Sequence, residues 1–142
     1  MTKHCLFGYT AYIDEQATIR YYEQAENWHC RCGDCRNFLA LAEKKGLPPF
    51  VLATLDSLGI PPQKATYVCM LSKENEGFLY QFSYRIAGYY EELLMPLSKR
   101  IDCCHEIYPY GAPGFPSPHF DLEFFIHLPW ILDESPDGEV KA

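Results

Sequence analysis

The clearest pattern in the chain is a regular alternation of side chains over residues 78–86. The aromatic and aliphatic residues at even positions would point to one side of an extended strand, and the polar residues at 81, 83 and 85 to the other. Residues 65–71 are rich in strand formers, and residues 73–77 between the two runs favour a turn. We therefore predict an antiparallel hairpin with one face on the core and the other toward water.

Two later segments, residues 101–108 and 120–127, repeat this strand pattern. The proline- and glycine-rich residues 108–118 between them can form neither a helix nor an inner strand. Together with the hairpin, these segments predict an antiparallel sheet of about four strands.

Helical patterns precede the hairpin. Residues 35–45 carry apolar side chains at helical spacing, with Asp34 as the expected N-cap. A second helix is expected to begin at the Pro48-Pro49 pair and to end at Gly59, which can adopt the left-handed conformation that terminates helices. We therefore predict an α+β fold in which an N-terminal helical hairpin packs on the sheet.

The first segment, residues 5–27, is ambiguous. Asp14 could cap and open a helix, whereas residues 18–23 could add a strand to the sheet. A chain of 142 residues with 48% hydrophobic content has the size and composition of one domain. We assign residues 1–132 to a single α+β domain and expect the acidic tail, residues 133–142, to fray.

The charge of the chain limits its partners. A net charge of −7, from 19 acidic and 12 basic side chains, would repel a phosphate backbone. The apolar runs stop well short of the roughly 20 residues that a bilayer span needs, and the N-terminus lacks the apolar core of a signal peptide. We expect a cytoplasmic protein with no nucleic-acid or membrane partner, whose partner, if any, is an unknown protein. The oligomeric state is not set by these patterns.

A cysteine cluster is the strongest sign of chemistry. The chain has seven cysteines, and this odd number excludes a fully paired disulfide framework. Cys30, Cys32 and Cys35 fall within six residues, and Gly33 would allow the chain to turn and bring them together. Thiolates at this spacing suit zinc, which binds about four ligands in a tetrahedral array. We therefore predict a structural zinc site.

The fourth zinc ligand must come from elsewhere in the chain. The candidates are His29, His4, Cys5, Cys103, Cys104 and His105. We assign Cys103, although burial in the core is an alternative for this residue because it lies in a predicted strand.

The same cysteines are also compatible with redox chemistry. Cys32-Gly33-Asp34-Cys35 opens a predicted helix, and Arg31 and Arg36 would favour a thiolate. Because Cys35 would lie in the first helical turn, we expect its pKa to fall below the ordinary thiol value. The chain has no strand-helix-strand unit around this sequence, which argues against a thioredoxin-like fold. Inert reduced thiols are the third alternative.

A second set of polar residues lies on the last predicted strand. His119, Asp121, Glu123 and His127 share one face of that strand and could bind a hard metal ion or act as acid and base. A solvated strand face has the same pattern. The familiar enzyme signatures, among them the Walker phosphate loop and the Gly-x-Ser-x-Gly elbow, are absent from the sequence.

Three short stretches carry a resemblance to a known family. They are Cys35-Arg36-Asn37-Phe38, Leu58-Gly59-Ile60-x-Pro62 and Pro129-Trp130-Ile131-Leu132-Asp133-Glu134. Together they resemble a family of small uncharacterised bacterial proteins, and the resemblance would cover most of the chain. It implies a bacterial cytosolic source and no particular activity.

These observations lead to three functional hypotheses. The first is a small non-enzymatic interaction module with a structural zinc ion. The second is a thiol-disulfide oxidoreductase that uses Cys32 and Cys35. The third is an acidic toxin-neutralising or other binding protein whose cysteines are inert. Metal content separates the first hypothesis from the other two.

Overall fold

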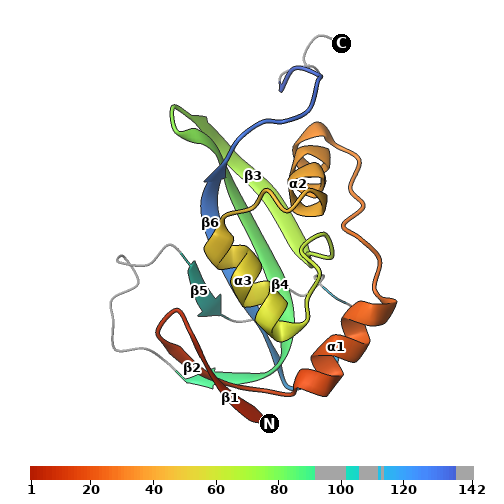
Figure 1. Cartoon of the computed structure of the whole chain (residues 1–142), viewed down its shortest axis with the longest axis vertical. Coiled ribbons are helices and arrows are strands. Elements are labelled where there is room, and N and C mark those ends of the chain that lie inside the picture. The colour runs from red at the N-terminus through yellow and green to blue at the C-terminus, as the bar shows by residue number, and fades with distance from the viewer. Residues whose placement is uncertain (92–101, 106–111, 113, 137–142) are drawn as a thin grey trace.

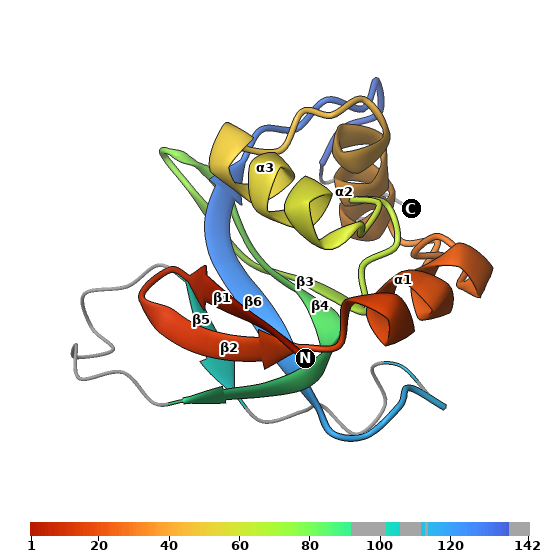
Figure 2. The same cartoon turned by 60° about the horizontal axis from the view of Figure 1, so that its bottom comes forward.

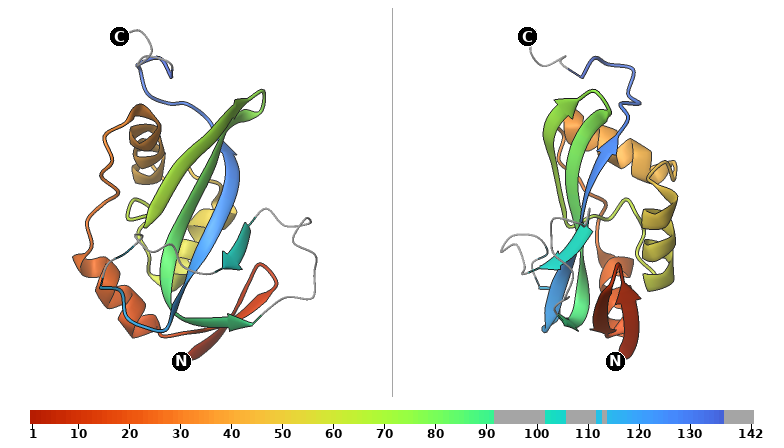
Figure 3. Two further views of the ribbon diagram at one scale, coloured as in Figure 1. Left: turned by 180° about the vertical axis from the view of Figure 1, so that it is seen from behind. Right: turned by 90° about the vertical axis from the view of Figure 1, so that its left-hand side faces the viewer.

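A computed structural model describes residues 1–91, 102–105, 112 and 114–136, and only the backbone of residues 102–105. The elements in chain order are β1 (Thr2–Leu6), β2 (Tyr9–Ile13), α1 (Glu15–Gln24), α2 (Gly33–Glu43), α3 (Pro49–Leu58), β3 (Tyr67–Glu74), β4 (Gly77–Glu91), β5 (Asp102–His105) and β6 (His119–Leu128). The three helices and the β1–β2 ribbon cover one face of an antiparallel sheet (Figure 1, Figure 3).

The sheet is organised around β4, which pairs along both edges. One edge pairs with β6 from Phe78 to Ala87. The other edge pairs first with β3, as far as Ser83, and then with β2 from Gly88 onward. Because β5 adds to the outer edge of β6, the order is β1-β2-β4-β6-β5 with β3 beside the first half of β4. Figure 2 shows β4 bending to run along β2.

Gly88 stands at the change of partner on β4. Its φ is +136°, and a Cβ atom at this position would lie 2.1 Å from the carbonyl oxygen of Tyr12. Any other residue would therefore push the β1–β2 ribbon away from the sheet.

The core lies between the helices and the even-numbered positions of β4. Tyr80, Phe82, Tyr84 and Ile86 are fully buried, so the predicted apolar face is confirmed. The opposite face was predicted to contact water, and this prediction is wrong at Ser83 and Arg85, which are 0% and 3% exposed. Arg85 is buried because the carboxylate of Asp121, directly across on β6, accepts two hydrogen bonds from it, at 2.8 and 3.1 Å.

The predicted N-terminal helical hairpin on about four strands is wrong. The chain begins with β1 and β2, α1 follows, and the described sheet has six strands. The helices α2 and α3 do not form the expected packed pair, because α2 packs mainly on β3 and α3 packs on α1. The two N-terminal strands are joined by Phe7 and Gly8 at φ +52° and +90°. This is the backbone of a type I′ turn, and phenylalanine is a poor sequence signal for it.

The other predicted elements agree closely with the structure. Asp14 caps α1 by accepting a hydrogen bond from the backbone N–H of Ala17, so residues 18–23 form no strand. The helix α3 begins at Pro49 and is followed by Gly59 at φ +72°, as predicted. The helix α2 begins at Gly33 with Cys32, not Asp34, as N-cap. None of the described helices is long and apolar enough to cross a membrane.

Part of the predicted pattern falls outside the described residues. Strand β5 covers residues 102–105 of the predicted strand at 101–108, and residues 101 and 106–108 lie outside the description. The acidic tail is described only as far as Pro136. Its fraying, like the division of the chain at residue 132, stays a prediction.

Candidate metal centre

Cys30, Cys32 and Cys35 converge where the coil after α1 enters α2. Their three sulfur atoms all lie within 4.8 Å of one another, so the group could hold a metal ion. Cys32 has an extended backbone as the N-cap (φ −67°, ψ 158°), and Gly33 starts the helix. Cys35 then lies one turn before the buried Phe38 on the core side of the helix. Cys30 and Cys32 are exposed, whereas Cys35 is 5% exposed.

Backbone N–H groups are directed at two of the three sulfur atoms. The backbone N–H of Cys35 donates to the sulfur of Cys32 at an N···S distance of 3.4 Å. The backbone N–H of Cys32 donates to the sulfur of Cys30, and this bond lowers the pKa of the Cys30 thiol. Such donors stabilise a thiolate relative to a thiol. The bond from Cys32 therefore favours negative charge on the sulfur of Cys30.

The third sulfur, on Cys35, has a different environment. Burial raises the pKa of the Cys35 thiol well above the ordinary value, and the neighbouring Cys32 and Cys30 raise it further. The predicted lowering of this pKa is therefore wrong, because desolvation outweighs the helix terminus. The indole N–H of Trp28 opposes this shift by lowering the Cys35 pKa. That N–H is buried and has no acceptor with full hydrogen-bond geometry.

A cation bound by the three sulfurs would stabilise the thiolate form of Cys35 and would provide the Trp28 N–H with an acceptor. A thiolate at Cys35 is a stronger acceptor than a thiol, so it would give the Trp28 N–H a partner. A buried donor without a partner costs about 1–3 kcal/mol. The residues present therefore fit a thiophilic metal ion such as zinc.

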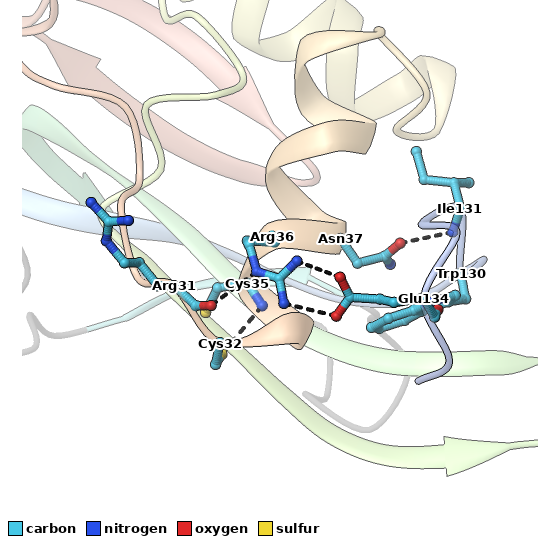
Figure 4. A network of polar contacts seen from close by, with 8 residues as sticks. All are labelled: Arg31, Cys32, Cys35, Arg36, Asn37, Trp130, Ile131 and Glu134. Atoms are coloured by element: carbon cyan, nitrogen blue, oxygen red, sulfur yellow. Dashed lines mark hydrogen bonds and ion pairs between the residues drawn. The ribbon is translucent and has the colours of Figure 1, made fainter. Parts of the chain in front are cut away.

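The helix that carries Cys35 is held by the C-terminal segment. The guanidinium of Arg36 donates two hydrogen bonds to the carboxylate of Glu134, at 2.6 and 2.7 Å, and a third to the carbonyl oxygen of Arg31, at 2.9 Å. The pair with Arg36 lowers the pKa of Glu134. Arg36 thus links the cysteine loop, residues 30–35, to the C-terminal segment, residues 129–136 (Figure 4).

Asn37, the next residue, also joins α2 to the C-terminal segment, and its side chain is buried. Its side chain is fully buried, accepts a hydrogen bond from the backbone N–H of Ile131 at 2.8 Å and donates to the carbonyl oxygen of Pro129 at 3.0 Å. It also donates to the hydroxyl of Tyr80, which in turn donates to the carbonyl oxygen of Asp34. Two of the stretches that carry the family resemblance therefore contact each other directly, although the resemblance itself stays a prediction.

Among the described side chains, no fourth potential metal ligand lies with the three sulfurs. His4 is bonded to Glu15, at 2.8 Å, and neither Cys5 nor His29 belongs to the group of converging ligands. The backbone of Cys103 lies in β5, at the edge of the sheet opposite β3 (Figure 1). Three strand spacings correspond to about 14 Å. The assignment of Cys103 as fourth ligand stays a prediction, and the strand order does not favour it.

The polar residues of the last strand do not form one site. Asp121 pairs with Arg85, Glu123 accepts a hydrogen bond from Gln81 at 2.6 Å, and the ring of His119 bonds to the carbonyl oxygen of Pro116. His127 instead pairs with Glu74. With Glu76, these two form a second group of metal-capable side chains, all exposed. This group was missed because the pairing of β6 with β4 brings His127 beside the β3–β4 turn, from which it is distant in sequence. The Glu74-x-Glu76 spacing was its only local signal.

The described side chains thus place the metal-capable thiols in one cluster held on two sides by hydrogen bonds. Comparisons of the chain with protein-family models, with curated proteins and with solved structures find no match.

Proposed function

We propose that this protein binds one zinc ion through Cys30, Cys32 and Cys35 and that the ion has a structural role. The observation that carries the proposal is an N–H group near each of the three sulfurs: two backbone donors and the unsatisfied indole of Trp28. Such donors are the outer-shell partners that orient and stabilise metal-bound ligands. The metal would tie the coil after α1 to the first turn of α2.

A structural role fits the surroundings of the cluster. The hydrogen bonds of Arg36 and Asn37 join α2 to the C-terminal segment, so the metal would complete a junction of three chain segments. A site of this kind adds its binding free energy to folding. We propose that the protein is a small cytoplasmic interaction module held together at this junction.

The second candidate is a thiol-disulfide oxidoreductase that uses Cys32 and Cys35. One observation favours it: Cys32 is exposed and Cys35 is buried. This is the arrangement expected for an attacking thiol and a resolving thiol, because the attacking thiol must be accessible. Metal content and a reversible dithiol titration separate this candidate from the first. The third hypothesis, a binding protein with inert cysteines, predicts neither property.

Native mass spectrometry of protein purified under reducing conditions without added metal tests the proposal. We expect one zinc ion per chain, and we expect Cys32→Ser to release it. Cys5→Ser is the matched control, because Cys5 is also exposed but lies outside the cluster in β1. A wild-type chain that takes up no zinc would refute the proposal. Stoichiometric zinc in a variant with serine at positions 30, 32 and 35 would refute the assignment of the ligands.

A further inference from the structure

A cavity of about 410 Å³ adjoins the cysteine cluster at Cys32. Its wall includes three basic side chains, those of Arg31, Arg36 and Lys73, and the acidic side chain of Asp34. Glu134 neutralises Arg36, so the other basic residues of the wall are Arg31 and Lys73, against the one acidic residue Asp34. The volume lies within the usual range for small-molecule sites, roughly 300–1,000 Å³.

The two arginines of this wall differ in their hydrogen bonds. Arg36 is held by Glu134 and by the carbonyl oxygen of Arg31, so it forms a fixed part of the wall. The guanidinium of Arg31 points away from the Arg36–Glu134 pair (Figure 4). A guanidinium offers a planar pair of donors that matches a carboxylate. The guanidinium of Arg31 extends away from Cys32 and Cys35 as well (Figure 4), so a ligand bound at the cluster must be long enough to reach outward to it.

The cluster supplies three ligands to a metal that commonly takes four. Among the described residues no further histidine, cysteine or carboxylate joins the three sulfurs. Zinc sites with three protein ligands keep their fourth position for water or for a small molecule. A soft sulfur ligand suits a zinc ion that already has thiolate ligands.

We propose that the fourth position of the metal opens on this cavity and takes a small thiol that also carries a carboxylate. The thiolate sulfur binds the metal, and the carboxylate pairs with Arg31. This inference rests on the proposed metal site and gives that site a ligand class. It makes the centre a binding site for a small molecule as well as a structural tie.

The test uses the full chain loaded with Co²⁺ in place of zinc, under anaerobic conditions. The visible spectrum of Co²⁺ changes with the number of bound thiolates, so it reports both metal uptake and the arrival of a further sulfur ligand. The probe is 3-mercaptopropionate, and 2-mercaptoethanol is the thiol control without a carboxylate. We expect 3-mercaptopropionate to intensify the thiolate-to-cobalt absorption and to bind roughly fivefold more tightly than the control.

Arg31→Ala should abolish the preference for the carboxylate-bearing thiol and leave cobalt uptake unchanged. Arg20→Ala, which removes an exposed arginine from α1, should keep that preference. Bound cobalt with a spectrum that neither thiol changes would overturn this inference and leave the metal proposal standing. Equal affinity for the two thiols in wild type and in Arg31→Ala would overturn the role of Arg31 and with it the ligand class. A chain that binds no cobalt would refute the metal proposal itself.

Discussion

Three cysteines that are close in sequence have different chemical properties in this protein. Cys30 is exposed, and a backbone N–H lowers its pKa, whereas burial raises the pKa of Cys35. Reactivity of a thiol depends on its thiolate fraction and on its access to solvent. Both factors make the Cys30 thiol more reactive than the Cys35 thiol.

The first prediction concerns the alkylation of these two thiols. In metal-free, reduced protein at pH 7.5, iodoacetamide should modify Cys30 at least about tenfold faster than Cys35, because Cys30 is accessible and more readily ionised. Peptide mass spectrometry over a time course measures the two rates. In denaturant the rates should converge, since both shifts depend on the fold. Equal rates in the folded protein would contradict the positions of the sulfurs described above.

Tyr22 provides a pH test of the core at the same scale. Burial raises its pKa well above the ordinary value, and its hydroxyl donates a 2.7 Å hydrogen bond to the carbonyl oxygen of Arg85. The unfolded chain ionises this phenol near pH 10, whereas the folded chain keeps it neutral. The stability that the buried, neutral Tyr22 side chain contributes is therefore fully present below about pH 10 and is lost as pH rises above that value.

The second prediction follows from this loss of stability at alkaline pH. Tyr22→Phe should lower the free energy of unfolding by about 1–2 kcal/mol at pH 7.5, because the carbonyl oxygen of Arg85 loses its partner. The variant should also lose less stability than wild type between pH 9 and pH 11. Urea unfolding at each pH measures both effects. Tyr89→Phe, which alters a half-exposed ring, should keep the alkaline slope of wild type.

Among the elements, β4 has the largest structural role because it pairs with β3, β6 and β2. The β1–β2 ribbon joins the sheet only along the last residues of β4, beginning where Gly88 pairs with Ile13. A substitution at this one position should therefore separate the ribbon from the sheet without altering the pairing of β4 with β6.

The third prediction is that Gly88→Ala destabilises the protein by about 3 kcal/mol. The substituted residue would have to keep φ near +136° and place its Cβ 2.1 Å from the oxygen of Tyr12, so the strands must move apart. Gly46→Ala is the control, because its Cβ would meet mainly the end of the Leu41 side chain. Urea unfolding should show a clearly smaller loss for the control, and a loss below about 1 kcal/mol at position 88 would contradict the described pairing.

The contact between α2 and the C-terminal segment depends on Asn37, whose buried amide bonds to the backbone of both Pro129 and Ile131. The fourth prediction is that Asn37→Ala lowers the free energy of unfolding by about 2 kcal/mol, because two partly buried backbone groups lose their partners. The ring of Trp130 packs on Phe78, so its fluorescence should report the release of the segment. Asn75→Ala, at the exposed β3–β4 turn, should leave both measurements unchanged.

At the scale of the whole molecule, the candidate metal centre joins parts that are far apart in sequence. The cysteine loop, the beginning of α2 and the segment after β6 meet at one place through the bonds of Arg36 (Figure 4). Metal binding at the loop should therefore stabilise the domain as a unit, because the ion binds the folded chain and not the unfolded one.

The fifth prediction is a melting temperature that depends on zinc. At free zinc about 100-fold above the dissociation constant, the free energy of unfolding should rise by roughly 2.7 kcal/mol. The gain should decrease as pH falls, since protons compete with zinc for the thiolates. Differential scanning calorimetry with zinc and with chelator measures this difference. Cys32→Ser should melt at the same temperature in both conditions, and a wild-type chain that did so would contradict a structural role.

The sequence by itself determined the elements whose signals are local. Alternation over residues 78–86 located β4 and its buried face, and Pro49 with Gly59 located α3. The cysteine cluster was also predictable, because three residues within six positions cannot lie far apart. Each of these conclusions depends on neighbours along the chain, and the tertiary structure leaves such neighbours in place.

The tertiary structure alone decided which distant residues meet. The N-terminal ribbon depends on a phenylalanine at positive φ and on the pairing of β2 with β4 beyond Gly88. The burial of Arg85 depends on Asp121, which lies on another strand. The raised pKa of Cys35 likewise depends on how much of the fold covers that sulfur. Burial and long-range pairing come from the packing of segments that are far apart in sequence, so no local pattern records them.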